Sequence, residues 1–224
     1  MKLSLLSFGE GPGGKSIMKP LSYISFLFKS SNAHGIHSPF VYAFTEGLYQ
    51  RQHILANDRA IPEGKPGKKA LQVLFRVINY FKSYKLIAVG SGDIAITEII
   101  RATGEKIDAQ IWFYSTLVPV PGGIDMGILC GEDKATLLAV FNELLPQVNN
   151  NSVIVLPDPH ATPALESSWE ALKKDPNVTV SIDTYHLGLL FFRHGQAKQH
   201  FTIRTTNSFL LNAVLGIKNL WGLF

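Results

Sequence analysis

A glycine-rich turn between an apolar run and an amphipathic stretch has the residue types for nucleotide binding. Residues 86–89 form an apolar run without polar alternation, which is typical of a strand buried on both faces. Gly90-Ser91-Gly92 then predicts a tight turn, Asp93 is placed to cap the helix that follows, and Gly104 stands where that helix should end. A strand, a glycine turn and a helix N-terminus form the corner at which doubly wound sheets bind nucleotides. The third glycine of the full fingerprint is absent, so the pattern also fits a turn that binds nothing.

A second glycine-rich segment, residues 9–16, matches the phosphate-binding pattern G-x-x-x-x-G-K-[ST]. In such a loop Lys15 would neutralise phosphate and Ser16 would hold Mg²⁺. Pro20, however, would interrupt the helix that must carry the loop. We therefore interpret residues 1–19 as an N-terminal extension and keep a P-loop nucleotide binder as an alternative.

The other reactive residue types are isolated in the sequence. Cys130 is the single cysteine, which excludes an internal disulfide and a cysteine-rich zinc site, and a lone cysteine at a strand end usually packs in the core. His34 and His37 have no carboxylate or cysteine at ligand spacing nearby, which favours turn and capping roles. No metal site is expected.

Composition favours one compact globular domain. The chain has 224 residues, of which 46% are hydrophobic and 17% charged, enough for one well-buried core. The net charge is +4, but the basic residues are scattered, so nucleic-acid binding is not expected. Residues 1–8 are too short for a signal peptide, and no run reaches the ~20 apolar residues of a membrane span. These features predict a cytoplasmic protein.

Alternating strand and helix patterns predict a mostly parallel α/β sheet with an antiparallel closing pair. Besides the run after Lys85, strands are expected at residues 110–114, 126–129, 152–156, 178–182 and 188–192. Helices are expected at residues 39–49, 70–81, 133–145 and 163–174, in addition to the one after Asp93. The apolar tail, residues 205–224, predicts a C-terminal helix that packs on its own domain or on the partner subunit of a homo-oligomer, with a membrane surface as the alternative.

Four segments outside the glycine turn resemble a known family. They are residues 34–42 (HGIHSPFVY), 74–82 (LFRVINYFK), 188–193 (GLLFFR) and 198–204 (KQHFTIR). The sequence of residues 20–204 is similar to a bacterial family of class I S-adenosylmethionine-dependent methyltransferases. The resemblance implies a Rossmann-like methyltransferase sheet, N-terminal helices and S-adenosylmethionine as the cofactor.

The sequence departs from this family at the positions that hold the cofactor. Ala88 stands where the first strand of the family carries an acid, and Ser115 stands where the second strand ends in an acid that binds the ribose. Residues 115–125 are too short for the strand and helix that the family has there, so we expect one strand and one helix to be missing and six strands in all.

The resemblance also assigns candidate site residues. For the cofactor they are Gly90-Ser91-Gly92, Ser115, and the Cys130-Gly131 pair after the strand at residues 126–129. Asp158 or His160, which follow the strand at residues 152–156, would be the catalytic base.

Three functions follow from these patterns. The first is a degenerate methyltransferase-like protein with a binding or structural role, which binds S-adenosylmethionine weakly or not at all. The second is an active small-molecule methyltransferase with an abbreviated cofactor site, and the third is the P-loop nucleotide binder. The sequence identifies neither a small-molecule substrate nor a protein partner.

The P-loop alternative can be tested on the intact chain. We expect ATP with Mg²⁺ to leave amide hydrogen exchange of residues 9–16 unchanged, because the helix that a P-loop requires is interrupted at Pro20. Protection that appears with ATP in the wild type and is lost in Lys15→Ala would establish the P-loop instead.

Overall fold

The computed structural model describes residues 18–31, 37–49, 66–90 and 93–205. The glycine-rich segment 9–16, His34, the pair Ser91-Gly92 and the tail from residue 206 lie outside the described residues. The predictions made for these segments therefore stay predictions.

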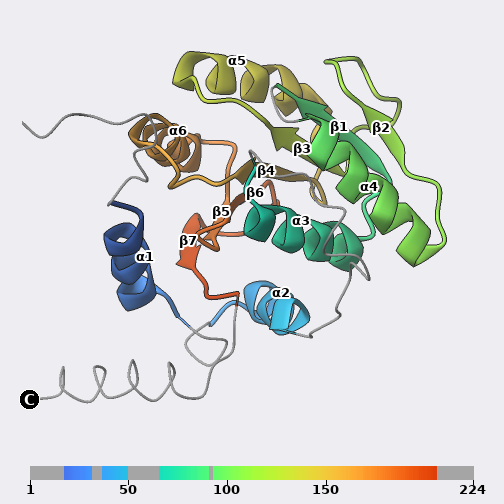
Figure 1. Cartoon of the computed structure of the whole chain (residues 1–224). Helices are drawn as coiled ribbons and strands as arrows, with labels where there is room; N and C mark the ends of the chain where they lie inside the picture. Colours follow the sequence, from blue (N-terminus) through green and yellow to red (C-terminus); the bar gives the residue numbers. More distant parts are fainter. Residues whose placement is uncertain (1–17, 32–36, 50–65, 91–92, 206–224) are drawn as a thin grey trace, which may run out of the picture.

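The described chain forms one seven-stranded sheet with helices on both faces (Figure 1). The strands are β1 (Lys85–Val89), β2 (Trp112–Tyr114), β3 (Met126–Leu129), β4 (Val153–Pro157), β5 (Val180–Asp183), β6 (Leu187–Phe191) and β7 (Gln199–Thr202). The helices are α1 (Met18–Lys29), α2 (Pro39–Tyr49), α3 (Lys68–Phe81), α4 (Asp93–Ile107), α5 (Lys134–Leu144), the short 3₁₀ turn η3 (Leu145–Gln147) and α6 (Pro163–Lys174). None of the described helices has the length and apolar character needed to cross a membrane.

The strand order is β2-β1-β3-β4-β6-β5-β7. The four strands from β2 to β4 are parallel, β6 is antiparallel to both β4 and β5, and β7 is parallel to β5. This arrangement confirms the Rossmann-like, mostly parallel α/β sheet and its antiparallel closing pair.

The prediction of six strands was wrong, because the sheet has seven. The prediction that no strand or helix lies between residues 115 and 125 is confirmed. Residues 115–125 contain no helix or strand, so β2 is an edge of the sheet. The seventh strand is β7, at the opposite edge. The sequence did not predict β7, because Gln199 and His200 are exposed and the strand shows little of the apolar pattern of a buried strand.

Two helix boundaries also differ from the prediction. Helix α4 continues through Gly104 to Ile107 and ends where Asp108 adopts a φ of 49°, while the amide of Ala109 donates to the carbonyl of Gly104 at 3.0 Å. A side chain at residue 104 would have little room there, which gives this glycine a packing reason inside the helix. Helix α1 begins at Met18, within the segment interpreted as an extension, and continues through Pro20. The interruption expected at Pro20 is therefore wrong, because proline is tolerated in the first turn of a helix.

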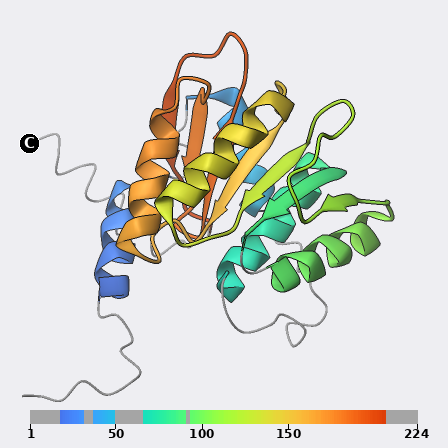
Figure 2. The ribbon, with the colours of Figure 1, turned by 90° about the horizontal axis from the view of Figure 1, so that it is seen from above.

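The core has two clusters of buried side chains, one on each face of the sheet, and Figure 2 shows the helices that cover the two faces. Helices α2, α3 and α4 cover one face, and α5 and α6 cover the other. Strands β3 to β6 are buried along their whole length because both faces are covered. The sequences of β3, β4 and β6 are accordingly apolar runs, whereas β5 also buries the polar side chains of Ser181 and Asp183.

The packing of Trp169 against Gly188 generates a stability prediction. A Cβ at Gly188 would lie 2.7 Å from the ring of Trp169, a side chain of α6 that is fully buried. We expect Gly188→Ala to lower the free energy of unfolding by about 1–3 kcal/mol, the usual cost of overpacking a core. Urea denaturation would measure it.

Gly131→Ala is the matched control. Its added Cβ would meet Leu137 at 3.4 Å, an ordinary contact, so we expect a change within about 0.5 kcal/mol. Equal stabilities of the two variants would contradict this account of the Trp169 contact.

Candidate functional site

The order of the strands reverses at the carboxyl ends of β1 and β3. From β1 the chain passes to β2 on one side and then returns to β3 on the other. In open α/β sheets such a switch point is where ligands bind. Gly90 follows β1, and Cys130 and Gly131 follow β3, so the structure brings these three predicted cofactor residues to the same place.

The backbones of the two strand ends touch at this point. Cys130 donates its amide to the carbonyl of Val89 at 2.8 Å, and Gly90 has a φ of +117°. A Cβ at Gly90 would lie 1.4 Å from the carbonyl oxygen of Cys130. Glycine is therefore required at residue 90 by the close approach of β3, whether or not a ligand binds.

A small pocket lies beside this contact. Its volume is about 50 Å³, whereas small-molecule sites usually enclose roughly 300–1,000 Å³. Its apolar lining includes Leu129, Pro157 and Leu165, and its carboxylates are Glu132 and Asp158. Cys130 and Gly131 also line it. The described residues thus leave room for water or for one small chemical group.

Ser115 and Ala88, the two positions where the sequence lacks an expected acid, do not line this pocket. Ser115 is exposed after the last residue of β2 and is not among the residues that line the pocket. Ala88 is 2% exposed and belongs to the core on the α3 and α4 face. The methyl group of Ala88 therefore packs in the core.

Asp158 joins three elements at the carboxyl edge of the sheet. Its Oδ2 accepts a hydrogen bond from the amide of Gly67 at 2.6 Å, and its own amide donates to the carbonyl of His186 at 2.9 Å. Gly67 is the N-cap residue of α3 and has no capping side chain of its own, so the carboxylate supplies the cap from a distant strand. Asp158 has a φ of 46°, a conformation that aspartate tolerates better than most residues.

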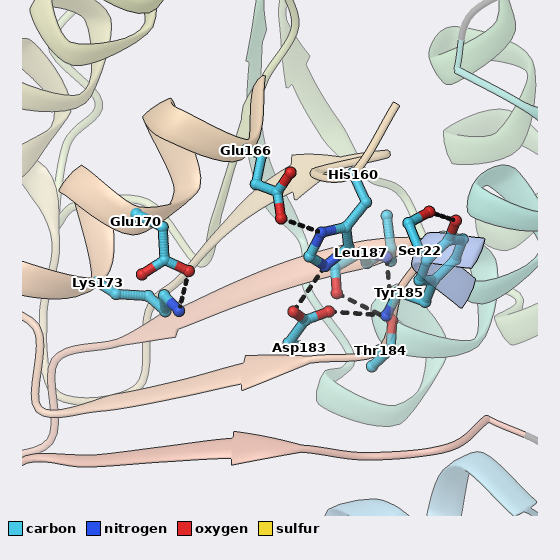
Figure 3. A network of polar contacts seen from close by, with 9 residues as sticks. All are labelled: Ser22, His160, Glu166, Glu170, Lys173, Asp183, Thr184, Tyr185 and Leu187. Atoms are coloured by element: carbon cyan, nitrogen blue, oxygen red, sulfur yellow. Dashed lines mark hydrogen bonds and ion pairs between the residues drawn. The ribbon is translucent and has the colours of Figure 1, made fainter. Parts of the chain in front are cut away.

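His160 belongs to a separate polar cluster between α6 and the turn that connects β5 to β6 (Figure 3). Its Nε2 lies 2.7 Å from Oδ2 of Asp183, and its Nδ1 lies 3.6 Å from Oε1 of Glu166. The imidazole stacks on the ring of Tyr185 at 5.2 Å. Figure 3 shows the His160 ring between the two carboxylates. Only 15% of the His160 side chain is exposed.

The two histidines of this region have opposite protonation preferences. Burial works against a charge on His160, but the hydrogen bond and charge of Asp183, followed by those of Glu166, outweigh it and raise the pKa of His160 above its ordinary value. Burial lowers the pKa of His186 to about 4, and the charge of Lys69 adds to this effect. At neutral pH His186 is therefore neutral, while the surroundings of His160 favour the imidazolium.

The two residues predicted as the catalytic base thus have different surroundings. Asp158 lines the pocket and caps α3, whereas His160 contacts Asp183 and Glu166 and is not among the pocket-lining residues. The sequence analysis missed Asp183, Tyr185 and His186. The sequence does hold one signal, since an aspartate side chain often accepts a hydrogen bond from the backbone amide two residues later. Here the amide of Tyr185 donates to Oδ1 of Asp183 at 2.8 Å.

Within the described residues, no group of three or more histidine, cysteine, aspartate or glutamate side chains is arranged to hold a metal ion. Carboxylates that could contact a cationic group in the pocket are those of Glu132 and Asp158.

Comparisons with known proteins find likeness in structure only. No family model matches the sequence, and no curated protein matches it. Similar solved structures include an O-methyltransferase of Bacillus cereus in complex with SAH, with a TM-score of 0.39, 10% identity, and coverage of 65% of this chain and 90% of that chain. A SAH-bound methyltransferase of Podospora anserina has a TM-score of 0.38, 12% identity, and coverage of 83% and 100%, respectively.

A third similar structure is the O-methyltransferase TomG of Streptomyces achromogenes in complex with SAM. Its TM-score is 0.38 and its identity 10%, with coverage of 67% of this chain and 94% of that chain. Likenesses at this distance assign no function to this chain.

The two roles of Asp158 predict a difference between its variants. Asp158→Ala removes the acceptor for Gly67 and places an unfavourable residue at positive φ, so we expect a loss of about 2–3 kcal/mol in the free energy of unfolding. Asp158→Asn keeps a side-chain oxygen and the tolerated conformation, and should lose less than half as much. Urea titrations of both variants would measure the difference, and equal losses would refute the capping role.

Proposed function

We propose that this chain is a methyltransferase-like protein whose cofactor site has degenerated, and that it has a binding or structural role. The observation that carries the proposal is the small pocket at the switch point. Among the described residues, the pocket at the carboxyl ends of β3 and β4 has a volume of about 50 Å³. A nucleoside cofactor needs several times that space.

The chemistry of the edge near β2 supports the same proposal. Bonds from ribose hydroxyls to a carboxylate contribute roughly 1.5–3 kcal/mol each, against roughly 0.5–1.5 kcal/mol for bonds between neutral groups. After β2 the chain offers Ser115 and Thr116, both exposed hydroxyls. This exchange alone lowers affinity by about tenfold. No strand or helix lies between β2 and β3 in the described chain, so no further element of the sheet covers Ser115 and Thr116 at this edge.

An active methyltransferase with an abbreviated site is the second candidate, and Asp158 is the observation that favours it. The Asp158 carboxylate lines the pocket and belongs to the same loop as His160. His160 is a poor general base, because its imidazolium form has no free lone pair and its two nitrogens face Asp183 and Glu166. In this candidate Asp158 would accept the proton of the methyl acceptor.

Calorimetric titration with S-adenosylmethionine and S-adenosylhomocysteine separates the two candidates. We expect no saturable binding tighter than about 1 mM, since only a few kcal/mol of interaction are available at such a site. Saturable binding in the micromolar range would overturn the degenerate-site proposal and promote the active enzyme.

Two pairs of variants make the titration more specific. Gly90 is unsuitable for substitution, because a side chain there collides with Cys130 in the absence of any ligand. Ser115→Asp supplies the missing carboxylate, with Ser115→Asn as its uncharged control, and we expect neither to create binding because the small pocket persists. If the wild type does bind, Gly131→Val should abolish binding at the pocket, and Gly131→Ala should preserve it.

A further inference from the structure

We propose that helix α1 is a pH-sensitive strap, held over the β5–β6 turn while His160 is protonated and released when His160 loses its proton. This inference does not depend on the proposed function. It rests on the way α1 is attached, on the geometry around His160, and on the contacts that connect the two.

Helix α1 is attached to the turn through one face of aromatic and polar side chains. Tyr23 and Phe26 pack edge-on against the ring of Tyr185, with ring centroids 4.8 and 5.3 Å away. Ser22 Oγ lies 2.7 Å from the hydroxyl of Tyr185. The opposite face of α1 carries Ile24 and Phe28, which are 47% and 52% exposed. Tyr185 is therefore the central contact of α1 on this turn, and Ser31, just after the helix, is held separately by the carbonyl of Thr202 at 2.8 Å.

The Tyr185 ring is in turn positioned by the His160 cluster (Figure 3). The two rings stack with an interplanar angle of 18°, and Phe26 lies 6.4 Å from the imidazole. Asp183 accepts from His160 through one carboxylate oxygen and from the amide of Tyr185 through the other. Tyr185 has a φ of 68°, so its backbone conformation needs the support of these contacts.

Protonation of His160 strengthens each of these contacts. As an imidazolium it donates from both nitrogens, toward Asp183 and toward Glu166, and its charge lies against the face of Tyr185, with the tilted ring of Phe26 6.4 Å away. When the proton at Nδ1 is lost, a lone pair faces the Glu166 carboxylate and the cation–π attraction disappears. The contacts that hold Tyr185, and through Tyr185 the contacts that hold α1, then become weaker.

The direction of the pH dependence follows from the groups around the cluster. They are Glu166 from α6, Asp183 from β5, Tyr185 and His186 from the turn, Lys69 from α3 and Tyr23 from α1. Because Asp183 and Glu166 raise the pKa of His160, its stabilising effect is fully present below the ordinary histidine value and is lost as pH rises through the raised pKa. His186, with a pKa of about 4, stays neutral in this range and takes a proton only in stronger acid.

Hydrogen exchange of the α1 amides tests the strap on the full chain. After correction for intrinsic exchange rates, we expect protection of residues 18–29 to fall at least about tenfold between pH 5 and pH 9. The midpoint should coincide with the titration of His160 followed by NMR. Amides of Val153–Pro157, in the buried strand β4, should keep their protection across the same range.

Three variants assign the effect to His160. His160→Gln should give low protection of α1 that no longer depends on pH, and Glu166→Gln should keep the dependence but move its midpoint to lower pH. His186→Gln, the matched control in the same cluster, should retain the wild-type fall. Constant protection of α1 from pH 5 to pH 9, or the same fall in His160→Gln, would overturn the proposal. If His160→Gln does not fold, an unmoved midpoint in Glu166→Gln would overturn it equally.

Discussion

The hydrogen bonds of Asp158 connect the parts of the carboxyl edge on which the candidate site and the α1 attachment depend. Its carboxylate caps α3 at Gly67, and its amide binds the carbonyl of His186 in the β5–β6 turn. That turn also carries Tyr185, against which α1 packs. One residue after β4 therefore fixes the position of a helix on one side and of the turn on the other.

This construction gives the polar residues of the edge structural contacts beside the small pocket that the described residues form. The carboxylates of Asp158 and Asp183 are used to hold the structure together, at Gly67 and at His160 respectively. At the ends of β1 and β3, the contact between Gly90 and the carbonyl of Cys130 leaves no room for a side chain at residue 90. Titratable groups at a sheet edge can thus serve packing and conformational control, and perturbed pKa values alone do not distinguish these roles from catalysis.

The sequence by itself determined most of the individual elements. Apolar runs without alternation correctly located β1, β3, β4 and β6, because burial on both faces favours apolar residues at every position. The start of a helix is set by local capping. Helix α6 (Pro163–Lys174) begins after Thr162, whose hydroxyl accepts a hydrogen bond from the amide of Leu165. The irregular residues 115–125 were also readable, since a segment of this length and composition cannot hold both a strand and a helix.

Only the tertiary structure decided which residues act together. The exposed β7 becomes a strand through pairing with β5, and its own residues carry little of the apolar pattern. Glycine is required at residue 90 by the nearby carbonyl of Cys130, 40 positions later in the chain. Asp158 caps a helix that begins far earlier in the chain, and His160 contacts Asp183 at the sheet edge. Sequence periodicity and capping report interactions within a few residues, whereas these contacts are set by strand order. For that reason the sequence indicated the fold, and the fold assigned the roles of its polar residues.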